Sequence, residues 1–299
     1  MSTFQFEVVI DQAICQTLKN QMSVLSTIRS RFHPLYRIRR TPWLFNLFHR
    51  LDFPVWVRCQ SLGMKMRLMW FRDMNWLFDS VPKEPELNEL MERMCETLRP
   101  KVFWDAGANL GWFSWLVNAK ASLSHAILFE PLPQNARLLR ETIQRNGFSH
   151  MKLIQAAVSD RCGDVSFKVD EKSGAASQLA EVFDESSDDT VGRAYGMQAE
   201  ITVRTTTLDA ELAAGSPVPD LMKIDIERAE HLALKGAEHL MDLGRTMIAF
   251  ECHREEAIQI LRARRFEIFI VDRLNNYLAV PPQMLDASRP VTRNLSRVE

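Results

Sequence analysis

The chain has 299 residues, of which 46% are hydrophobic and 25% charged, and its formal net charge is −1. This length and composition suit one large globular domain with an extension, or two small domains. The balanced charge argues against a molecule whose overall field gathers nucleic acid, so we expect no nucleic-acid partner.

The cysteines and the first residues bear on the compartment. The five cysteines form no CxxC pair, so free thiols in a reducing cytoplasm are the simplest interpretation. The start MSTFQFEVVIDQAI lacks the basic region of a signal peptide, and no apolar run approaches the roughly 18 residues of a membrane span. We therefore expect a cytoplasmic protein.

Residues 1–54 are predicted to form a helical, basic and aromatic extension. No acidic residue occurs between Gln12 and Leu51, and residues 29–50 mix arginines with aromatic and aliphatic side chains. One interpretation is a helix pair that packs on the main domain with its arginines in water. The other is peripheral contact with an anionic membrane surface through residues 29–50.

Residues 55–282 have the pattern of an α/β domain, with a core at about 100–272 and a tail at 283–299. Short apolar runs at 55–77 suit strands or hairpins, and EPELNELMERMCETLRP suits a helix. Strands and helices then alternate. The predicted strands are KVFWDAGA, HAILFEP, MKLIQAAVS, DLMKIDI, RTMIAFEC and FEIFIVD. The predicted helices are GWFSWLVNAK, PQNARLLRETIQRNG, AEHLALKGAEHLM and REEAIQILRARR.

This alternation predicts a Rossmann-like fold with a mostly parallel central sheet and helices on both faces. Right-handed crossovers place the carboxyl ends of the parallel strands at one edge, where ligands bind. DVSFKV and ITVRTTTLD indicate additional strands. Between them, the acidic insertion at about 170–200 is either a solvated loop or a lid over the site.

The stretch VFWDAGANLGWFSW leads a buried strand into a tight glycine turn. A dinucleotide site has the pattern GxGxxG, but Asn109 and Trp112 occupy the second and third glycine positions after Gly107. The indole of Trp112 prevents the close packing that the third glycine allows. The carboxylate of Asp105 would repel a pyrophosphate, whereas it suits the ammonium and sulfonium groups of S-adenosylmethionine.

Glu130 ends the second predicted strand, 19 positions after Gly111. A carboxylate at this point can accept two hydrogen bonds from a ribose diol, which S-adenosylmethionine offers. Alternatively, Glu130 only stabilises the N-terminus of the following helix. Together with Asp105 and the altered glycine pattern, Glu130 favours the cofactor site.

Four stretches carry a resemblance to a known family: VFWDAGANLGWFSW, ILFEPLPQNARLLRETIQRNG, LIQAAVSD and LMKIDIERAEHLALKGAEHL followed by IAFECH. The chain resembles the FkbM family of S-adenosylmethionine-dependent methyltransferases, which implies the class I methyltransferase fold. The resemblance implies that the turn from Asp105 to Gly111, with Gly107 and Asn109, holds the methionine part. It also implies Glu130 at the ribose, Ala157 and Val158 near the adenine, and Asp225 facing the reacting methyl group.

Methyl transfer to a hydroxyl requires a base, and the candidates follow two neighbouring strands. They are Asp225, Glu227, Glu230, Glu251 and His253. We predict Asp225, Glu227 and His253 as catalytic residues. No ligand spacing demands a metal ion, so none is predicted, although some O-methyltransferases use one.

The predicted reaction is O-methylation of a hydroxyl on a sugar, glycolipid or secondary metabolite. The family usually has glycine where Arg228 stands, and Arg228 is either a harmless surface residue, a contact for an acidic substrate or the lid, or a block to the acceptor. Two alternatives therefore stay open. One is a weakened or non-catalytic scaffold with the methyltransferase fold, and the other is a nucleotide-sugar or dinucleotide enzyme on a similar sheet. The sequence does not fix the oligomeric state.

Overall fold

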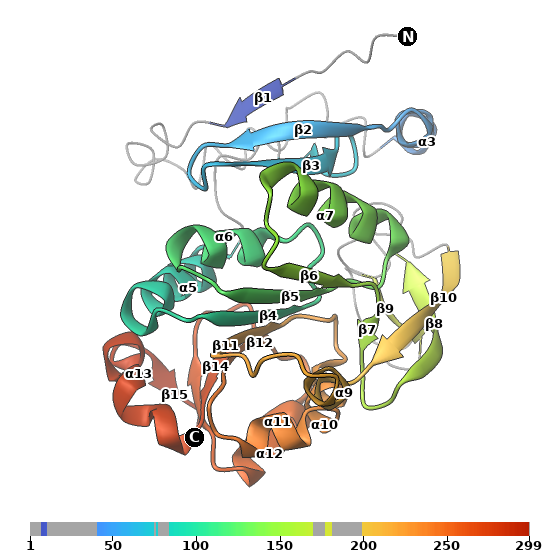
Figure 1. The fold of residues 1–299 in the computed structure, drawn as a ribbon. Coiled ribbons are helices and arrows are strands. Elements are labelled where there is room, and N and C mark those ends of the chain that lie inside the picture. Colours follow the sequence, from blue (N-terminus) through green and yellow to red (C-terminus); the bar gives the residue numbers. More distant parts are fainter. Residues whose placement is uncertain are drawn as a thin grey trace. The chain divides into compact units, whose positions relative to one another are not determined.

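The fold is known from a computed structural model that describes residues 7–10, 41–74, 76, 84–169, 177–180 and 199–298 (Figure 1). The chain divides into two compact units, Met1–Pro82 and Lys83–Glu299. This break falls later than the predicted boundary after residue 54, because the next strands pair with the preceding segment and not with the main sheet. Within the described ranges, no helix is both long enough and apolar enough to cross a membrane.

The first unit contains a small sheet and one described helix. Strand β1 (Glu7–Ile10) pairs in parallel with β2 (Pro54–Cys59), which forms a hairpin with β3 (Met64–Met69). The hairpin and the helix α3 (Pro42–Arg50) were predicted. The strand β1 differs from the predicted helix, because its sequence EVVI is rich in β-branched residues that favour strands. Most of the predicted membrane-contact segment precedes residue 41 and lies outside the described residues.

The second unit is built on an eight-stranded sheet in the order β15-β13-β14-β12-β11-β4-β5-β6. Its strands are β4 (Val102–Ala106), β5 (His125–Phe129), β6 (Met151–Ile154), β11 (Leu221–Ile224), β12 (Met247–Glu251), β13 (Glu267–Ile270), β14 (Asn276–Val280) and β15 (Ser296–Arg297). The five strands from β12 to β6 are parallel. Their chain order reverses between β4 and β11, as in a doubly wound fold.

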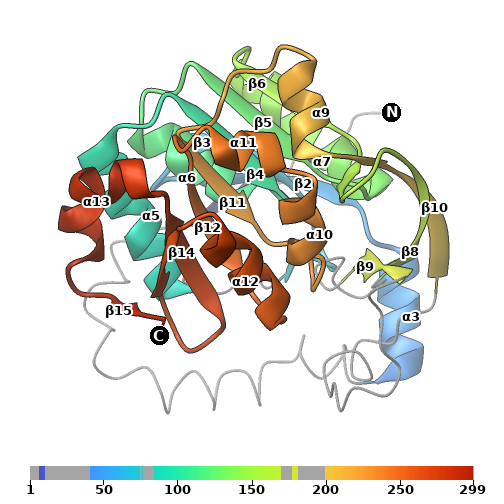
Figure 2. The ribbon, with the colours of Figure 1, turned by 90° about the horizontal axis from the view of Figure 1, so that it is seen from below.

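Helices cover both faces of this sheet. On one face lie α5 (Pro85–Leu98), α6 (Trp112–Lys120) and α7 (Pro133–Asn146). On the other lie α9 (Leu208–Ala213), α10 (Glu230–Lys235), α11 (Glu238–Asp242) and α12 (Glu255–Ala263) (Figures 1 and 2). The largest apolar core lies between the sheet and this second layer, around the buried Trp104 and Phe250. The predicted Rossmann-like α/β fold, with a mostly parallel central sheet and helices on both faces, is confirmed.

A second sheet, in the order β7-β10-β8-β9, stands beside the first. Its strands are β7 (Ala157–Val158), β8 (Gly163–Val169), β9 (Gln178–Leu179) and β10 (Ala199–Thr206). The two additional strands predicted from the sequence are therefore present. Most of the acidic insertion at 170–200 lies outside the described residues, and its described part includes β9.

Three predicted elements differ from the structure. The run MKLIQAAVS is not one strand but two, β6 and β7, which belong to different sheets. The single predicted helix at 229–241 is broken at Gly236, where a side-chain carbon would lie 2.2 Å from the carbonyl oxygen of Ser159. The predicted tail is ordered as α13 (Leu285–Thr292) and β15, and Arg93 of α5 donates a hydrogen bond to the carbonyl of Val291.

Candidate functional site

A pocket opens beyond the carboxyl ends of β4, β5 and β11, where the chain order of the sheet reverses. It encloses about 500 Å³, counting space open to solvent. Doubly wound sheets bind ligands at this point. Seven of the ten predicted site residues line it: Gly107, Asn109, Glu130, Ala157, Val158, Asp225 and Glu227. The other three predicted site residues, which are also described in the structure, do not line the pocket: Asp105, Gly111 and His253.

The glycine turn after β4 is held by the end of β5. The backbone N–H groups of Gly107 and Ala108 both bond to the carbonyl of Phe129, at 3.1 and 2.9 Å. Gly107 has a φ of +85°, and an added Cβ would lie 1.9 Å from the carbonyl oxygen of Asp225. Only glycine permits both this conformation and this approach of β4 to the segment after β11. The turn therefore brings two predicted site segments together.

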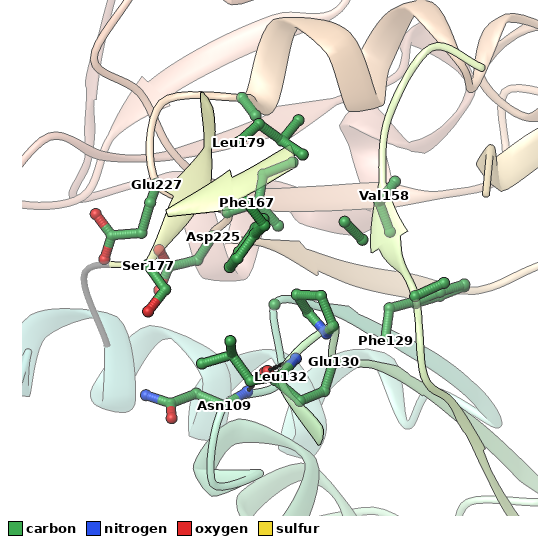
Figure 3. Close-up of a pocket in the computed structure, with 16 residues that line it drawn as sticks. Asn109, Phe129, Glu130, Leu132, Val158, Phe167, Ser177, Leu179, Asp225 and Glu227 are labelled. Carbon is green, nitrogen blue, oxygen red and sulfur yellow. Dashed lines mark hydrogen bonds between the residues drawn. The ribbon is translucent and has the colours of Figure 1, made fainter. Parts of the chain in front are cut away.

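Glu130 lies in the pocket wall, and the residue is 4% exposed. Its two oxygens accept bonds from the backbone N–H groups of Asn109 and Leu132, each at 2.8 Å. A carboxylate has about four lone-pair positions, so these two bonds do not by themselves exhaust its accepting capacity. In Figure 3, Asn109 and Glu130 lie on one side of the pocket, and Asp225 and Glu227 on the other.

Asp105 and Gly111 make packing and hydrogen-bond contacts within the fold and do not line the pocket. The Asp105 carboxylate is 2% exposed and accepts a 2.6 Å hydrogen bond from the hydroxyl of Ser114 in α6. Burial raises the pKa of Asp105, although nearby Lys223 opposes the shift. Gly111 has a φ of +80°, and a Cβ there would meet the indole of Trp115 at 2.5 Å. Direct contact of these two residues with a ligand is therefore not supported by this geometry.

An apolar wall faces the turn. It includes Ala157 and Val158, which were predicted, and also Leu132, Phe167 and Leu179, which were not. Leu132, Phe167, Leu179 and Ala157 share one small core with Val203 and Ala229. The alternation in GDVSFKV predicts a strand, but it does not tell which face of that strand meets a pocket.

Charged side chains gather where β11 and β12 end. Lys223 is 4% exposed, donates a 2.7 Å hydrogen bond to the carboxylate of Asp225, and lies 4.8 Å from the ring centre of Phe113. Glu251 hydrogen-bonds Asp225 and also lies 3.0 Å from Nε2 of His253. A continuous chain of polar contacts thus runs from the pocket wall at Asp225 to His253.

The protonation states differ along this chain. Burial opposes ionisation of Asp225, but Lys223 and the bond from Glu251 outweigh it, so the pKa of Asp225 is lowered. Burial raises the pKa of Glu227 well above its usual value, and the neighbouring Asp225 adds to the effect. The hydrogen bond to Glu251 raises the pKa of His253, with burial opposing. Asp225 is therefore the carboxylate of this group whose ionised form the surroundings favour.

Glu230 holds the turn between β11 and α10. Its Oε1 accepts bonds from the backbone N–H groups of Ile226 and Arg228, at 3.3 and 3.2 Å. These bonds stabilise two successive left-handed residues, Glu227 at φ +53° and Arg228 at φ +74°. A positive φ favours glycine, which is the residue that the resemblance implies at the position of Arg228. The arginine side chain is half-buried.

Glu84 belongs to the same charged group, and the sequence did not reveal it. It directly precedes α5 with a φ of +54°, and its carbonyl accepts bonds from the backbone and the side chain of Asn88. Asn88 in turn accepts a 2.6 Å bond from the indole of Trp112, next to the glycine turn. Burial raises the pKa of Glu84 to about 7, with Asp225 adding and Lys223 opposing. An acidic side chain from before the main sheet thus joins this group, and its ionisation depends on pH near neutrality.

Glu84→Gln is expected to stabilise the protein above neutral pH. Because the pKa of Glu84 rises from 4.5 to about 7 on folding, the stability it contributes is complete below pH 4.5 and is lost as the pH rises through about 7. Near pH 8 the free energy of unfolding of the neutral variant should exceed that of the wild type by up to about 3 kcal/mol. Near pH 4 the two free energies of unfolding should be about equal. Urea unfolding at both pH values measures this, with the exposed Glu89→Gln as control. An equal gain at both pH values would contradict the assignment.

The described residues contain no group of three His, Cys, Asp or Glu side chains arranged to hold a metal ion. Four of the five cysteines fall within the described ranges, and all four are free thiols.

The comparisons with known proteins agree with this geometry. A family model described as the methyltransferase FkbM domain matches residues 105–270. No curated protein matches the chain.

Several solved methyltransferases resemble the fold distantly. A methyltransferase FkbM from Methylobacillus flagellatus KT has a TM-score of 0.41 and 17% identity over 60% of this chain and 43% of its own. This chain therefore spans less than half of that protein. Precorrin-6y C5,15-methyltransferase from Geobacter metallireducens GS-15 has a TM-score of 0.38 and 11% identity, over 66% and 87% of the two chains. A methyltransferase from Geobacter sulfurreducens has a TM-score of 0.39 and 14% identity, over 67% and 79%. Similarities this low do not indicate an acceptor.

Proposed function

This chain belongs to the methyltransferase FkbM family, and from this premise we propose that it uses S-adenosylmethionine to methylate a hydroxyl group on a sugar, glycolipid or secondary metabolite. The observation that carries the proposal is the charge of the pocket. Its described lining contains three acidic residues, Glu130, Asp225 and Glu227, and no lysine or arginine. The raised pKa of Glu227 favours its neutral form, so Glu130 and Asp225 supply the negative charge. Such a lining favours a ligand with positive charge and disfavours a pyrophosphate, which speaks against a dinucleotide or nucleotide-sugar enzyme.

The wall also fits the uncharged parts of the cofactor. Glu130, at the end of β5, is placed to bond the ribose hydroxyls. The apolar side chains of Val158, Phe167 and Leu179 offer a slot for the adenine ring. Asp225 and Glu227 lie across the pocket from Glu130 and would face the methionine end (Figure 3).

The cofactor supplies an electrophilic methyl group on a positively charged sulfur. The protein must then take the proton of the acceptor hydroxyl, and the ionised Asp225 in the pocket wall is placed to receive it. Glu251 would pass the proton that it shares with Asp225 to Nε2 of His253. The side chain of His253 is 28% exposed and can release the proton to water. His253 thus acts at the end of the relay and not in the pocket itself.

Glu130→Gln is expected to weaken binding of S-adenosylhomocysteine about 10- to 100-fold. The amide keeps the size of the side chain, but it replaces charge-assisted bonds to the ribose with weaker ones, and each such bond to a charged group contributes about 1.5–3 kcal/mol. Isothermal titration calorimetry measures the affinity. The exposed Glu96→Gln in α5 is the matched control and should bind as the wild type does.

Two results would count against the proposal. The first is no binding of S-adenosylmethionine or S-adenosylhomocysteine to wild-type protein whose circular dichroism is that of a folded α/β domain. The second is a larger thermal shift with NAD than with S-adenosylhomocysteine. If Glu130→Gln and the wild type bind S-adenosylhomocysteine equally well, only the role assigned to Glu130 is ruled out, and the proposed cofactor is not.

A further inference from the structure

An exposed apolar ridge lies on α3 and the segment that follows it. Seven large apolar side chains are well exposed in the described part of the chain, and four of them lie within eleven residues. These four form what we call the α3 ridge: Trp43, Leu47, Leu51 and Phe53, with exposed fractions of 67%, 47%, 60% and 50%. Trp43, Leu47 and Leu51 are spaced by four residues and therefore share one face of the helix.

The opposite face of α3 anchors the helix to its own unit. Phe45 is 8% exposed and lies 5.6 Å from the ring of Phe71, and Phe48 stacks on the same ring at 5.6 Å. Phe45, Phe71 and Met74 form a small buried core. The helix is thus fixed by its buried face. Of the ridge, Phe53 also packs on Trp70 beside this core, with 5.8 Å between the ring centres. A contiguous exposed apolar patch of this kind marks an interaction surface.

The charge of the first unit indicates what the ridge meets. Residues 1–82 contain eleven Lys and Arg but five Asp and Glu, a net charge of +6, whereas residues 83–299 contain 26 and 33, a net charge of −7. Two of the acidic residues of this unit, Asp52 and Asp73, are held within the fold. Asp73 pairs with Arg72 and is 3% exposed, and Asp52 accepts bonds from two backbone N–H groups. The excess of positive charge therefore belongs to the unit that carries the ridge.

We propose that the α3 ridge docks the protein on an anionic membrane surface. Trp43 and the leucines would enter the boundary between headgroups and acyl chains, where an indole is favoured, while the basic residues of the unit attract anionic lipid. Arg50, exposed at the end of α3, lies next to the ridge in sequence and would reach the headgroups. The helix of nine residues would lie on the surface and not cross it.

Two other partners fit the ridge less well. The positive charge of the unit would attract RNA. Binding of RNA phosphates, however, does not require the exposed apolar side chains of the α3 ridge. A second copy of the chain would bury the apolar ridge, but it would also bring two units of charge +6 together.

Vesicle co-sedimentation of the full-length protein tests the proposal. Wild type should bind vesicles of phosphatidylcholine with phosphatidylglycerol, bind pure phosphatidylcholine at least tenfold more weakly, and lose binding as salt rises. The double variant Trp43→Ser with Leu47→Ser should bind the anionic vesicles at least about tenfold more weakly than the wild type. Leu274→Ser, at a leucine of the other unit with 57% exposure, is the matched control and should bind as wild type does.

A second measurement reports insertion directly. Brominated lipids should quench the tryptophan fluorescence of the wild type, and quenching should fall in Trp43→Phe, which keeps an apolar side chain and the fold. The proposal is overturned by equal binding with and without anionic lipid, or by unchanged binding in the double variant. It is also overturned if light scattering shows that the wild type is a dimer and the double variant a monomer, while neither binds vesicles. Binding of the wild type to single-stranded RNA but not to vesicles would overturn it as well.

Discussion

Replacing Asp225 with asparagine is expected to lower the rate of methyl transfer about 100- to 10,000-fold, because the variant loses the group that takes the hydroxyl proton. The amide has nearly the same shape, so the pocket wall is retained. It cannot accept a proton, and it cannot balance the positive charge of a sulfonium. The rate is measured at saturating cofactor with any sugar or glycolipid that the wild type methylates in a screen of hydroxyl acceptors.

The same variant should lose its preference between two ligands. S-adenosylmethionine carries the sulfonium charge and S-adenosylhomocysteine does not, so only the first gains from the Asp225 carboxylate. We expect the ratio of their dissociation constants to change about tenfold or more in Asp225→Asn, with the affinity for S-adenosylhomocysteine almost unchanged. The exposed Asp164→Asn is the control and should alter neither the rate nor the ratio.

The relay predicts how Asp225 and His253 combine. His253 must be neutral to receive a proton, and its pKa is raised by Glu251, so the rate should fall as the pH drops through a value above 6.5. The loss in the double variant Asp225→Asn with His253→Asn should be smaller than the product of the single losses, because the two residues act on one proton. A folded Asp225→Asn protein that turns over at the wild-type rate would rule out the relay.

The site residues that the sequence predicted best are those placed by local geometry. Glu130 and Asp225 directly follow buried strands, and parallel strands end at one edge, so their convergence follows from the pattern alone. Gly107 was recognisable because a tight turn must follow β4. Asp105, predicted to bind the cofactor, does not line the pocket. Its position in the strand is local, but the direction of its side chain toward Ser114 depends on where α6 packs.

The residues that the sequence missed come from distant segments. Phe167 and Leu179 reach the pocket from a second sheet, whose pairing with β10 spans more than thirty residues of chain. Glu84 joins the charged group through the packing of α5, outside the segment that resembles the family. The antiparallel strand β14 lies between β13 and β12 because non-local pairing, not periodicity, decides strand order. The fold class was therefore predictable, and the far wall of the pocket was not.

Replacing Gly107 with alanine is expected to destabilise the second unit by about 4 kcal/mol or more, which ranks among the large effects of single substitutions. Two causes act together. The residue has a φ of +85°, and the new Cβ would lie 1.9 Å from the backbone oxygen of Asp225. The clash is with backbone and not with a flexible side chain, so β4 and the segment after β11 would have to separate. Urea unfolding, followed by circular dichroism, measures the loss.

Gly215→Ala isolates the first cause. Gly215 has a φ of +89°, but nothing lies within 4 Å of its added Cβ, so this variant should lose only about 1–2 kcal/mol for the left-handed conformation. The excess loss in Gly107→Ala then measures the close approach of the two segments that form the pocket. Any Gly107→Ala protein that still folds should bind S-adenosylhomocysteine more weakly, because Asn109 and Asp225 line the pocket from the two segments that are forced apart. Equal losses in the two variants would mean that β4 and the segment after β11 do not approach as closely as the structure has them, and the assignment of Asp225 to the same pocket as Glu130 would fail with it.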